Sequence, residues 1–285
     1  MPVDHAISAR DLARMAQQVP ALPLTFQRIQ ELVSNPRSTN NQLAEAVGAD
    51  QGLTTRILRL ANSSFYGLAA RVDTISQAVA LIGTRQVRDL ALATAVVDVF
   101  KDIPAGALDG HGFWEHSLAV GSASRLIAAK RHERETERYF VAGLLHDIGL
   151  VVMASQMPER VAVNLLSARE AQQPLTVIER RELGFDHAEV GGMVIEHWCL
   201  PPAMSEVATH HHHLLTSARH LHDCATIHLA DVLVDALAYG SSGEPVVTPL
   251  DPPAWELLGL TATDLTPITS DLERQMVEVT AIFLG

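Results

Sequence analysis

A histidine and an aspartate, His146 and Asp147, stand side by side in the apolar run of residues 142–149, AGLLHDIG. A run of this composition belongs in a protein core, where a carboxylate without a partner costs several kcal/mol or more. The pair therefore needs either hydrogen bonds and a cation, or a metal ion. Because other segments must supply those partners, this pair constrains the fold more than any other feature of the sequence.

The composition predicts a globular, all-α protein. The chain has 285 residues, which allows one large domain or two. Hydrophobic residues make up 47% of the chain and charged residues 19%, values typical of globular proteins. Aromatic residues are only 5%, whereas alanine and leucine are abundant, and this balance favours helices over sheets.

The charge and the cysteine content argue against several classes of protein. The formal net charge is -12 and no basic face is visible, which weakens a nucleic-acid-binding role. Cys199 and Cys224 are too few for a disulfide framework, and no secretory signal opens the chain. The apolar runs look too short to span a bilayer. We therefore expect a soluble, cytoplasmic protein that does not associate with a membrane.

Apolar residues recur at helical spacing along most of the chain, between glycine, proline and capping residues. We expect Asp50 and Asp186 to cap helices, Thr84 to cap the helix that ends at Phe100, and Pro201 to open a helix at its first position. No strand pair is predicted. The predicted helices cover residues 6–18, 26–33, 39–48, 50–62, 74–82, 84–100, 113–130, 136–154, 158–172, 175–183, 187–197, 201–213, 219–239 and 263–284.

Residues 39–62 form a helix, a tight glycine turn and a second helix, as in a helix-turn-helix unit. Arg56 and Arg59 on the second helix are a weak sign of DNA reading. The alternative is a packed helical hairpin, which the acidic total favours.

Glycine and proline residues at 101–111 and the loop at 241–245 divide the chain. We predict an N-terminal helical subdomain at 1–105, a helical bundle with the histidine and aspartate residues at 106–240, and a C-terminal loop and helix at 241–285 that pack on the body.

Several histidine and aspartate residues lie on otherwise apolar helix faces and could share one site. They are His116, His146, Asp147, His187, two of the histidines at 210–213, and Asp231. Imidazole and carboxylate groups are ligands for Zn, Mn, Fe or Mg. The adjacent pair suits two metal ions, because the histidine can bind one ion while the carboxylate spans both. Two such ions can clamp a phosphoryl group and activate water as a nucleophile.

Each of these residues also has a plain structural explanation. His116 could be a core histidine bonded to a carbonyl, and His187 could help to cap a helix. The four-histidine run could be a solvated helix end. Asp231 could pair with His228, three residues earlier in its helix.

The order of His116, His146-Asp147 and Asp231 resembles the H…HD…D pattern of the HD superfamily of metal-dependent phosphohydrolases. The additional His187, His211 and His212 resemble the binuclear variant in HD-GYP cyclic-di-GMP phosphodiesterases. Over residues 20–235 the chain resembles an HDOD domain, the HD-related output domain of bacterial signalling proteins. The motifs that carry the resemblance are residues 22–23 (LP), 49–67 (ADQGLTTRILRLANSSFYG), 75–83 (ISQAVALIG), 113–117 (FWEHS), 143–149 (GLLHDIG) and 185–191 (FDHAEVG).

This resemblance implies an N-terminal helical part packed on a multi-helix, HD-like bundle. It also implies a signalling or regulatory module, since HDOD domains often lack demonstrated hydrolase activity. No Gly-Tyr-Pro triplet follows His213-Leu214-Leu215, which argues against cyclic-di-GMP hydrolysis. The register of the histidine run stays open: the pair is either 211 and 212, or 210 and 211.

We therefore expect a regulatory protein that acts through contacts with signalling proteins, using the N-terminal hairpin or the acidic surface. Its pocket would hold one or two divalent ions of Fe, Mn, Zn or Mg, or be a degenerate site kept for structure. The alternative is a metal-dependent phosphohydrolase on a nucleotide or other phosphodiester, with His146 and Asp147 at its catalytic centre. Nucleic-acid binding through residues 39–62 is the third hypothesis.

Overall fold

In the computed structural model, residues 15–101, 103, 108–214 and 219–285 are described, and these residues form helices and connecting loops without a strand. The all-α prediction is confirmed. Most of the predicted helix at 6–18 lies outside the described residues. The same is true of residues 102 and 104–107 at the predicted subdomain boundary, and of residues 215–218, where Leu215 follows the histidine run.

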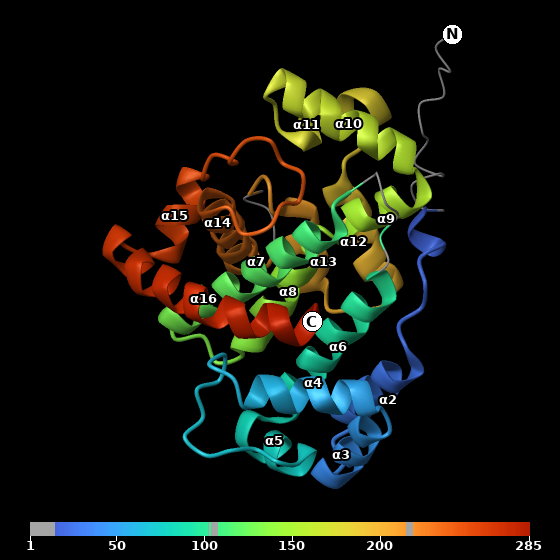
Figure 1. Cartoon of the computed structure of the whole chain (residues 1–285), viewed down its shortest axis with the longest axis vertical. Helices are drawn as coiled ribbons and strands as arrows, with labels where there is room; N and C mark the ends of the chain where they lie inside the picture. Colours follow the sequence, from blue (N-terminus) through green and yellow to red (C-terminus); the bar gives the residue numbers. More distant parts are fainter. Residues whose placement is uncertain (1–14, 102, 104–107, 215–218) are drawn as a thin grey trace.

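The N-terminal helices gather at one end of the molecule (Figure 1, blue to teal). They are α2 (Leu24–Ser34), α3 (Asn40–Gly48), α4 (Gln51–Ala61), α5 (Ile75–Ile82) and α6 (Thr84–Phe100). Side chains cap three of them: Thr39 and Thr74 form capping boxes, and Asp50 accepts a hydrogen bond from the Leu53 amide. The predicted cap at Thr84 is wrong. Gly83, with φ 100°, ends α5 and directly precedes α6, so Thr84 already lies inside the helix.

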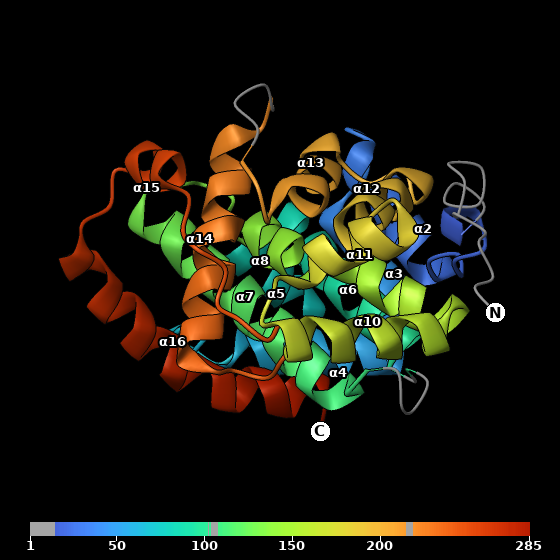
Figure 2. The same ribbon diagram turned by 90° about the horizontal axis from the view of Figure 1, so that it is seen from above.

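Among the remaining helices, α7 packs against α8, α14 and α16, and α12 packs against α9 and α13 (Figures 1 and 2). The remaining helices are α7 (Gly110–Lys130), α8 (Thr136–Leu145), α9 (Ile148–Gln156), α10 (Pro158–Ala171), α11 (Leu175–Leu183), α12 (His187–His197), α13 (Pro202–His210), α14 (Leu221–Leu237), α15 (Pro252–Leu258) and α16 (Ala262–Phe283). Two details differ from the prediction. Pro201 is the residue before the helix and Pro202 its first residue, and the short α15 was not predicted.

The single helix predicted at 136–154 is wrong, because a two-residue turn at His146 and Asp147 separates α8 from α9. The Leu150 amide donates to the Asp147 carbonyl at 2.9 Å, which starts the new helix. Apolar residues continue on both sides of the turn, so periodicity could not reveal it. The turn matters for the site because it presents two adjacent side chains to the same centre.

Residues Thr136–Gln156 are together long and apolar enough to cross a membrane, which differs from the expectation that the apolar runs are too short. Most of this stretch is buried inside the protein, and the turn at 146–147 interrupts it. The stretch is therefore accounted for as two core helices.

The two arginines of the helical hairpin contact the protein itself. Arg56 forms an ion pair with Asp98 at 2.5 Å, and Arg59 donates to the Ala281 carbonyl at 3.1 Å. These contacts favour a packed hairpin over a DNA-reading unit, because the groups that would meet phosphate or bases are already engaged.

One hydrophobic core extends through the described residues from Met15 to Phe283. The helix α16 packs against both α7 and α4, so it connects the C-terminal part with the N-terminal one. The predicted subdomain boundaries at residues 105 and 240 therefore stay a prediction. The parts on either side of them contribute to the same hydrophobic core.

Two glycine contacts let the ligand-bearing helices approach closely. A Cβ at Gly143 would lie 2.8 Å from Gly121 Cα, where α8 meets α7. A Cβ at Gly149 would lie 2.0 Å from the His187 carbonyl oxygen and 2.5 Å from the Gly191 nitrogen, where α9 meets α12. Backbone atoms cannot swing away as a side chain can, so these positions require glycine.

We expect Gly149→Ala to lower the free energy of unfolding by about 2–3 kcal/mol, because the methyl group would separate α9 from α12. Urea unfolding followed by circular dichroism measures this change. The control is Gly52→Ala on the exposed side of α4, where the nearest atom is Asp50 Oδ1 at 3.4 Å. That variant should keep or slightly raise the stability. Equal stability of both variants would contradict the tight contact.

Candidate metal centre

The structure brings together all seven residues of the predicted site. They come from α7 (His116), the α8–α9 turn (His146, Asp147), the start of α12 (His187), the segment after α13 (His211, His212) and α14 (Asp231). Every one of them is buried, and the most exposed, His212, is only 8% exposed. Their ligand atoms form two groups, within each of which they lie within 4.8 Å of one another.

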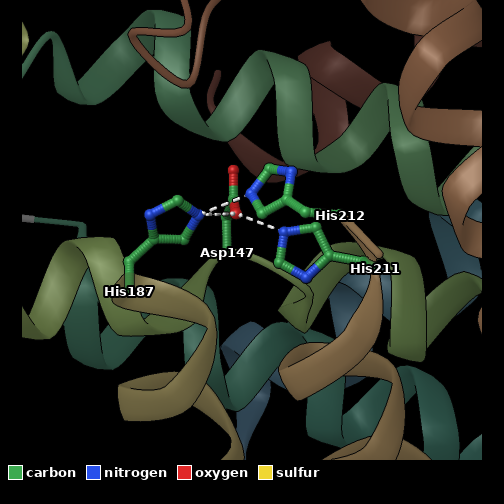
Figure 3. A group of neighbouring side chains, drawn as sticks. All are labelled: Asp147, His187, His211 and His212. Carbon is green, nitrogen blue, oxygen red and sulfur yellow. Dashed lines mark hydrogen bonds and ion pairs between the residues drawn. The ribbon is translucent and has the colours of Figure 1, made fainter. Parts of the chain in front are cut away.

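The first group is Asp147, His187, His211 and His212 (Figure 3). Asp147 Oδ1 lies 3.1 Å from His211 Nε2 and 3.3 Å from His187 Nε2. The Nε2 atoms of His187 and His212 are 2.8 Å apart. Four potential ligand atoms therefore face one point. The register of the histidine run is 211 and 212, because His210 is partly exposed and His213 exposed.

The second group is His116, His146 and Asp231. Asp231 Oδ1 lies 3.1 Å from His116 Nε2 and 3.6 Å from His146 Nε2. Asp147 joins the two groups, since its Oδ2 is 3.3 Å from His146 Nε2 while its Oδ1 belongs to the first group. This is the position expected for a carboxylate that spans two ions.

Several buried atoms of the centre have no hydrogen-bond partner in suitable geometry among the described residues, although some lie 3.1–3.6 Å from the Asp147 and Asp231 oxygens. They are both ring nitrogens of His116, His146 Nε2, Asp147 Oδ1 and His211 Nε2. A buried polar atom left without a partner costs about 1–3 kcal/mol. Five imidazoles and two carboxylates that converge with free lone pairs fit a pair of divalent transition-metal ions.

A second layer of hydrogen bonds orients three of the imidazoles. The Nδ1 atoms of His146 and His211 donate to the Gly143 and Ala208 carbonyls, at 2.6 and 2.9 Å. His187 donates from Nδ1 to the Glu179 carboxylate at 2.7 Å. With a proton on Nδ1, each ring presents the lone pair of Nε2 to the centre, as metal-bound histidines usually do.

The electrostatics of the centre keep its carboxylate ionised. Burial opposes the charge of Asp147, but His146, His187 and His211 outweigh burial and hold its pKa well below the usual range. Burial, together with His211 and His187, lowers the pKa of His212 well below its ordinary value, so this imidazole is neutral. Burial lowers the pKa of His146, but Asp147 and Asp231 outweigh burial and raise it well above its ordinary value; Glu179 and Asp147 do the same for His187. Because a metal-bound imidazole is neutral, these two rings would each release a proton when an ion binds.

The structure does not support the alternative structural roles considered for His116, His187 and Asp231. His116 makes no hydrogen bond to a carbonyl, and the cap of α12 is Asp186, whose side chain accepts from the Glu189 amide at 3.0 Å. Asp231 pairs with His116. His228 instead donates from Nδ1 to the His211 carbonyl at 2.6 Å.

Glu179 and Asp235 were not among the predicted site residues. Glu179 lies between Leu175 and Leu183 at spacings of four residues, so it occupies an apolar helix face. Asp235 follows Asp231 by one helical turn, and its Oδ1 lies 3.6 Å from His116 Nδ1. Both residues could have been found from the sequence, because each is an acidic residue on an otherwise apolar helix face. The same feature identified Asp231.

Known proteins share this fold. A structure from Geobacter sulfurreducens, described as an HDOD domain protein with unknown function, is 24% identical, covers 98% of this chain and all of its own, and superposes with a TM-score of 0.81. A structure from Shewanella amazonensis SB2B, described as a candidate phosphohydrolase, is 25% identical over 98% of this chain and all of its own, with a TM-score of 0.76.

A curated relative is an uncharacterized protein of Treponema pallidum (strain Nichols), 26% identical over 207 residues. The match covers 72% of this chain but only 40% of that longer protein. The sequence model of the HDOD domain family matches residues 19–214, which span the first six of the seven site residues in chain order. The chain therefore belongs to the HDOD domain family.

Proposed function

We propose that this protein is a regulatory HDOD module of bacterial signal transduction that holds two divalent metal ions in a closed centre. The observation that carries the metal site is the pair of buried ligand groups joined by Asp147. The family supports the signalling role. We expect the module to act in the cytoplasm through contacts with signalling proteins, without binding nucleic acid or a membrane.

In this proposal His116, His146 and Asp231 hold one ion, and His187, His211 and His212 hold the other. Asp147 contributes one oxygen to each. Five imidazoles favour Fe, Mn or Zn over Mg, which prefers oxygen ligands and keeps several waters. Glu179 and the carbonyls of Gly143 and Ala208 would keep the rings in place when an ion binds or leaves.

The closed surroundings of the centre favour regulation over turnover. No ligand side chain is more than 8% exposed, so a phosphodiester has no direct path to the metal positions in this conformation. A cavity of about 890 Å³ lies elsewhere, between α4 and α16. Contacts of the surface with partner proteins are therefore the favoured output.

A metal-dependent phosphohydrolase is the second candidate. The shared carboxylate favours it, because two ions held in this way supply Lewis acidity and an activated water. The related structure from Shewanella amazonensis SB2B is described as a candidate phosphohydrolase. In this case His146 and Asp147 would be central to catalysis on a nucleotide or another phosphodiester, and the centre would have to open.

Metal content tests the centre. After reconstitution with Mn²⁺ or Zn²⁺, we expect the protein to retain two ions per chain, one for each ligand group. Asp231→Ala should keep only the ion of the first group, and Asp147→Ala neither, because Asp147 serves both. Inductively coupled plasma mass spectrometry gives the stoichiometry. His213→Ala, an exposed neighbour of the ligands, is the matched control and should bind like the unchanged protein. Metal-free protein after reconstitution would refute the centre.

Turnover separates the two candidates. We expect the Mn²⁺-loaded protein to hydrolyse bis(p-nitrophenyl) phosphate no faster than Asp147→Ala, because the ligands are enclosed. Release of p-nitrophenol at 405 nm, a wavelength at which only the product absorbs, would be the readout. Activity that His213→Ala keeps and Asp147→Ala loses would replace the regulatory proposal with the hydrolase.

A further inference from the structure

Residues 239–251 connect α14 to α15 without forming a helix. In both views this orange-red segment extends from the end of α14 toward α10 and α11 (Figures 1 and 2). Its polar contacts are with the elements that carry or support the ligands of the metal centre. Three of these contacts define its course.

The first contact is with α7. The Ser241 amide donates to the Gly112 carbonyl at 2.9 Å, one helical turn before His116. At the neighbouring Gly240, a Cβ would lie 2.5 Å from the backbone nitrogen of His116. Gly240 has φ 61°, so this close approach to the backbone of a ligand residue requires glycine.

The second contact is with α11. Both carboxylate oxygens of Glu244 lie 3.1 Å from the Leu175 amide, which donates to them. The residue before this helix is Pro174, which provides no side-chain cap, so Glu244 caps α11 from 69 residues away. One turn further along α11, Glu179 accepts the hydrogen bond from His187.

The third contact is with α14 and the end of the histidine run. The Asp251 amide donates to His228 Nε2 at 3.0 Å, and His228 in turn donates to the His211 carbonyl. Asp251 Oδ2 accepts from the Leu214 amide at 3.0 Å. His228 lies three residues before Asp231, so this end of the segment contacts the supports of both ligand groups.

We propose that residues 239–251 are a strap that closes the metal centre, and that Glu244 is its latch. The strap contacts residues about one turn from His116, Glu179 and Asp231, so lifting it would uncover the centre from the side that the strap covers. Glu244 is the latch because it lies between the other two contacts along the chain and is held to α11 by the Leu175 amide. The proposal rests on the metal-binding function, since closure matters if the centre holds ions.

The charge around Glu244 agrees with this position. Burial raises the pKa of its carboxyl to about 8; the Leu175 amide and His187 lower it, and Asp147 and Asp231 raise it further. Residues of both ligand groups therefore influence the pKa of the Glu244 carboxyl.

The test measures access of a reagent to the buried histidines in metal-free protein. Diethyl pyrocarbonate modifies imidazoles that solvent reaches, and mass spectrometry locates the modified residue. We expect Glu244→Ala to label His116 and His187 about tenfold faster than the unchanged protein, the effect of losing one buried hydrogen bond on an opening equilibrium. His132, which is exposed in the closed state, should label at the same rate in both.

Two further variants separate opening from a general loss of stability. Glu244→Gln keeps a carbonyl acceptor for the Leu175 amide and should label close to the unchanged protein. Glu182→Ala removes an exposed carboxylate from the other end of α11 and should have no effect. Unchanged labelling of His116 and His187 in Glu244→Ala would overturn the strap, as would equally faster labelling of all histidines.

Release of Zn²⁺ from loaded protein to the chelator 4-(2-pyridylazo)resorcinol gives the second readout. Glu244→Ala should release its ions about tenfold faster while binding the same number. Binding of no Zn²⁺ by the unchanged protein would refute the proposed metal function, whereas the labelling rates would still decide whether the strap exists. Equal release rates would overturn the latch role of Glu244.

Discussion

The structure depends on one buried carboxylate, that of Asp147, which lies between two sets of imidazoles. Its two oxygens face different sets, within 3.1–3.3 Å of His211, His187 and His146. A negative charge at this depth is tolerable only where positive charge meets it from several directions. The turn between α8 and α9, and the glycine contacts of these helices with α7 and α12, are the means by which the fold supplies such surroundings.

Two successive shells of contacts hold the imidazoles of the centre in place. Carbonyls of the same helices and the Glu179 carboxylate hold the imidazoles, and the segment from Gly240 to Asp251 in turn contacts the elements that carry these supports. A metal centre enclosed in this way can stabilise one conformation of a signalling module without meeting a substrate. Under the proposed function, the same ligands would become a hydrolytic site only if the enclosure opened, so access to the ions, and not the ligand set, would separate regulation from catalysis.

Much of the fold could be predicted because its signals are local. Caps at Asp50 and Asp186 follow from side-chain chemistry, and apolar spacing located most helices within a few residues. The break at 146–147 could not be predicted in this way, since apolar residues continue on both sides of it. Thr84 failed as a cap because Gly83 alone joins α5 to α6, a connection that depends on backbone conformation.

By itself the sequence determined the helical class and indicated five residues of the candidate centre, His116, His146, Asp147, His187 and Asp231, with two more in the run 210–213. Histidine and aspartate on apolar faces demand partners wherever they are buried. Only the tertiary structure decided which atoms meet. It placed His211 and His212 inward in the register of the run, paired Asp231 with His116 instead of His228, and brought Glu179 and Glu244 to α12 and α11. These choices depend on contacts between segments far apart in the chain, and no local periodicity encodes the distance between two helices.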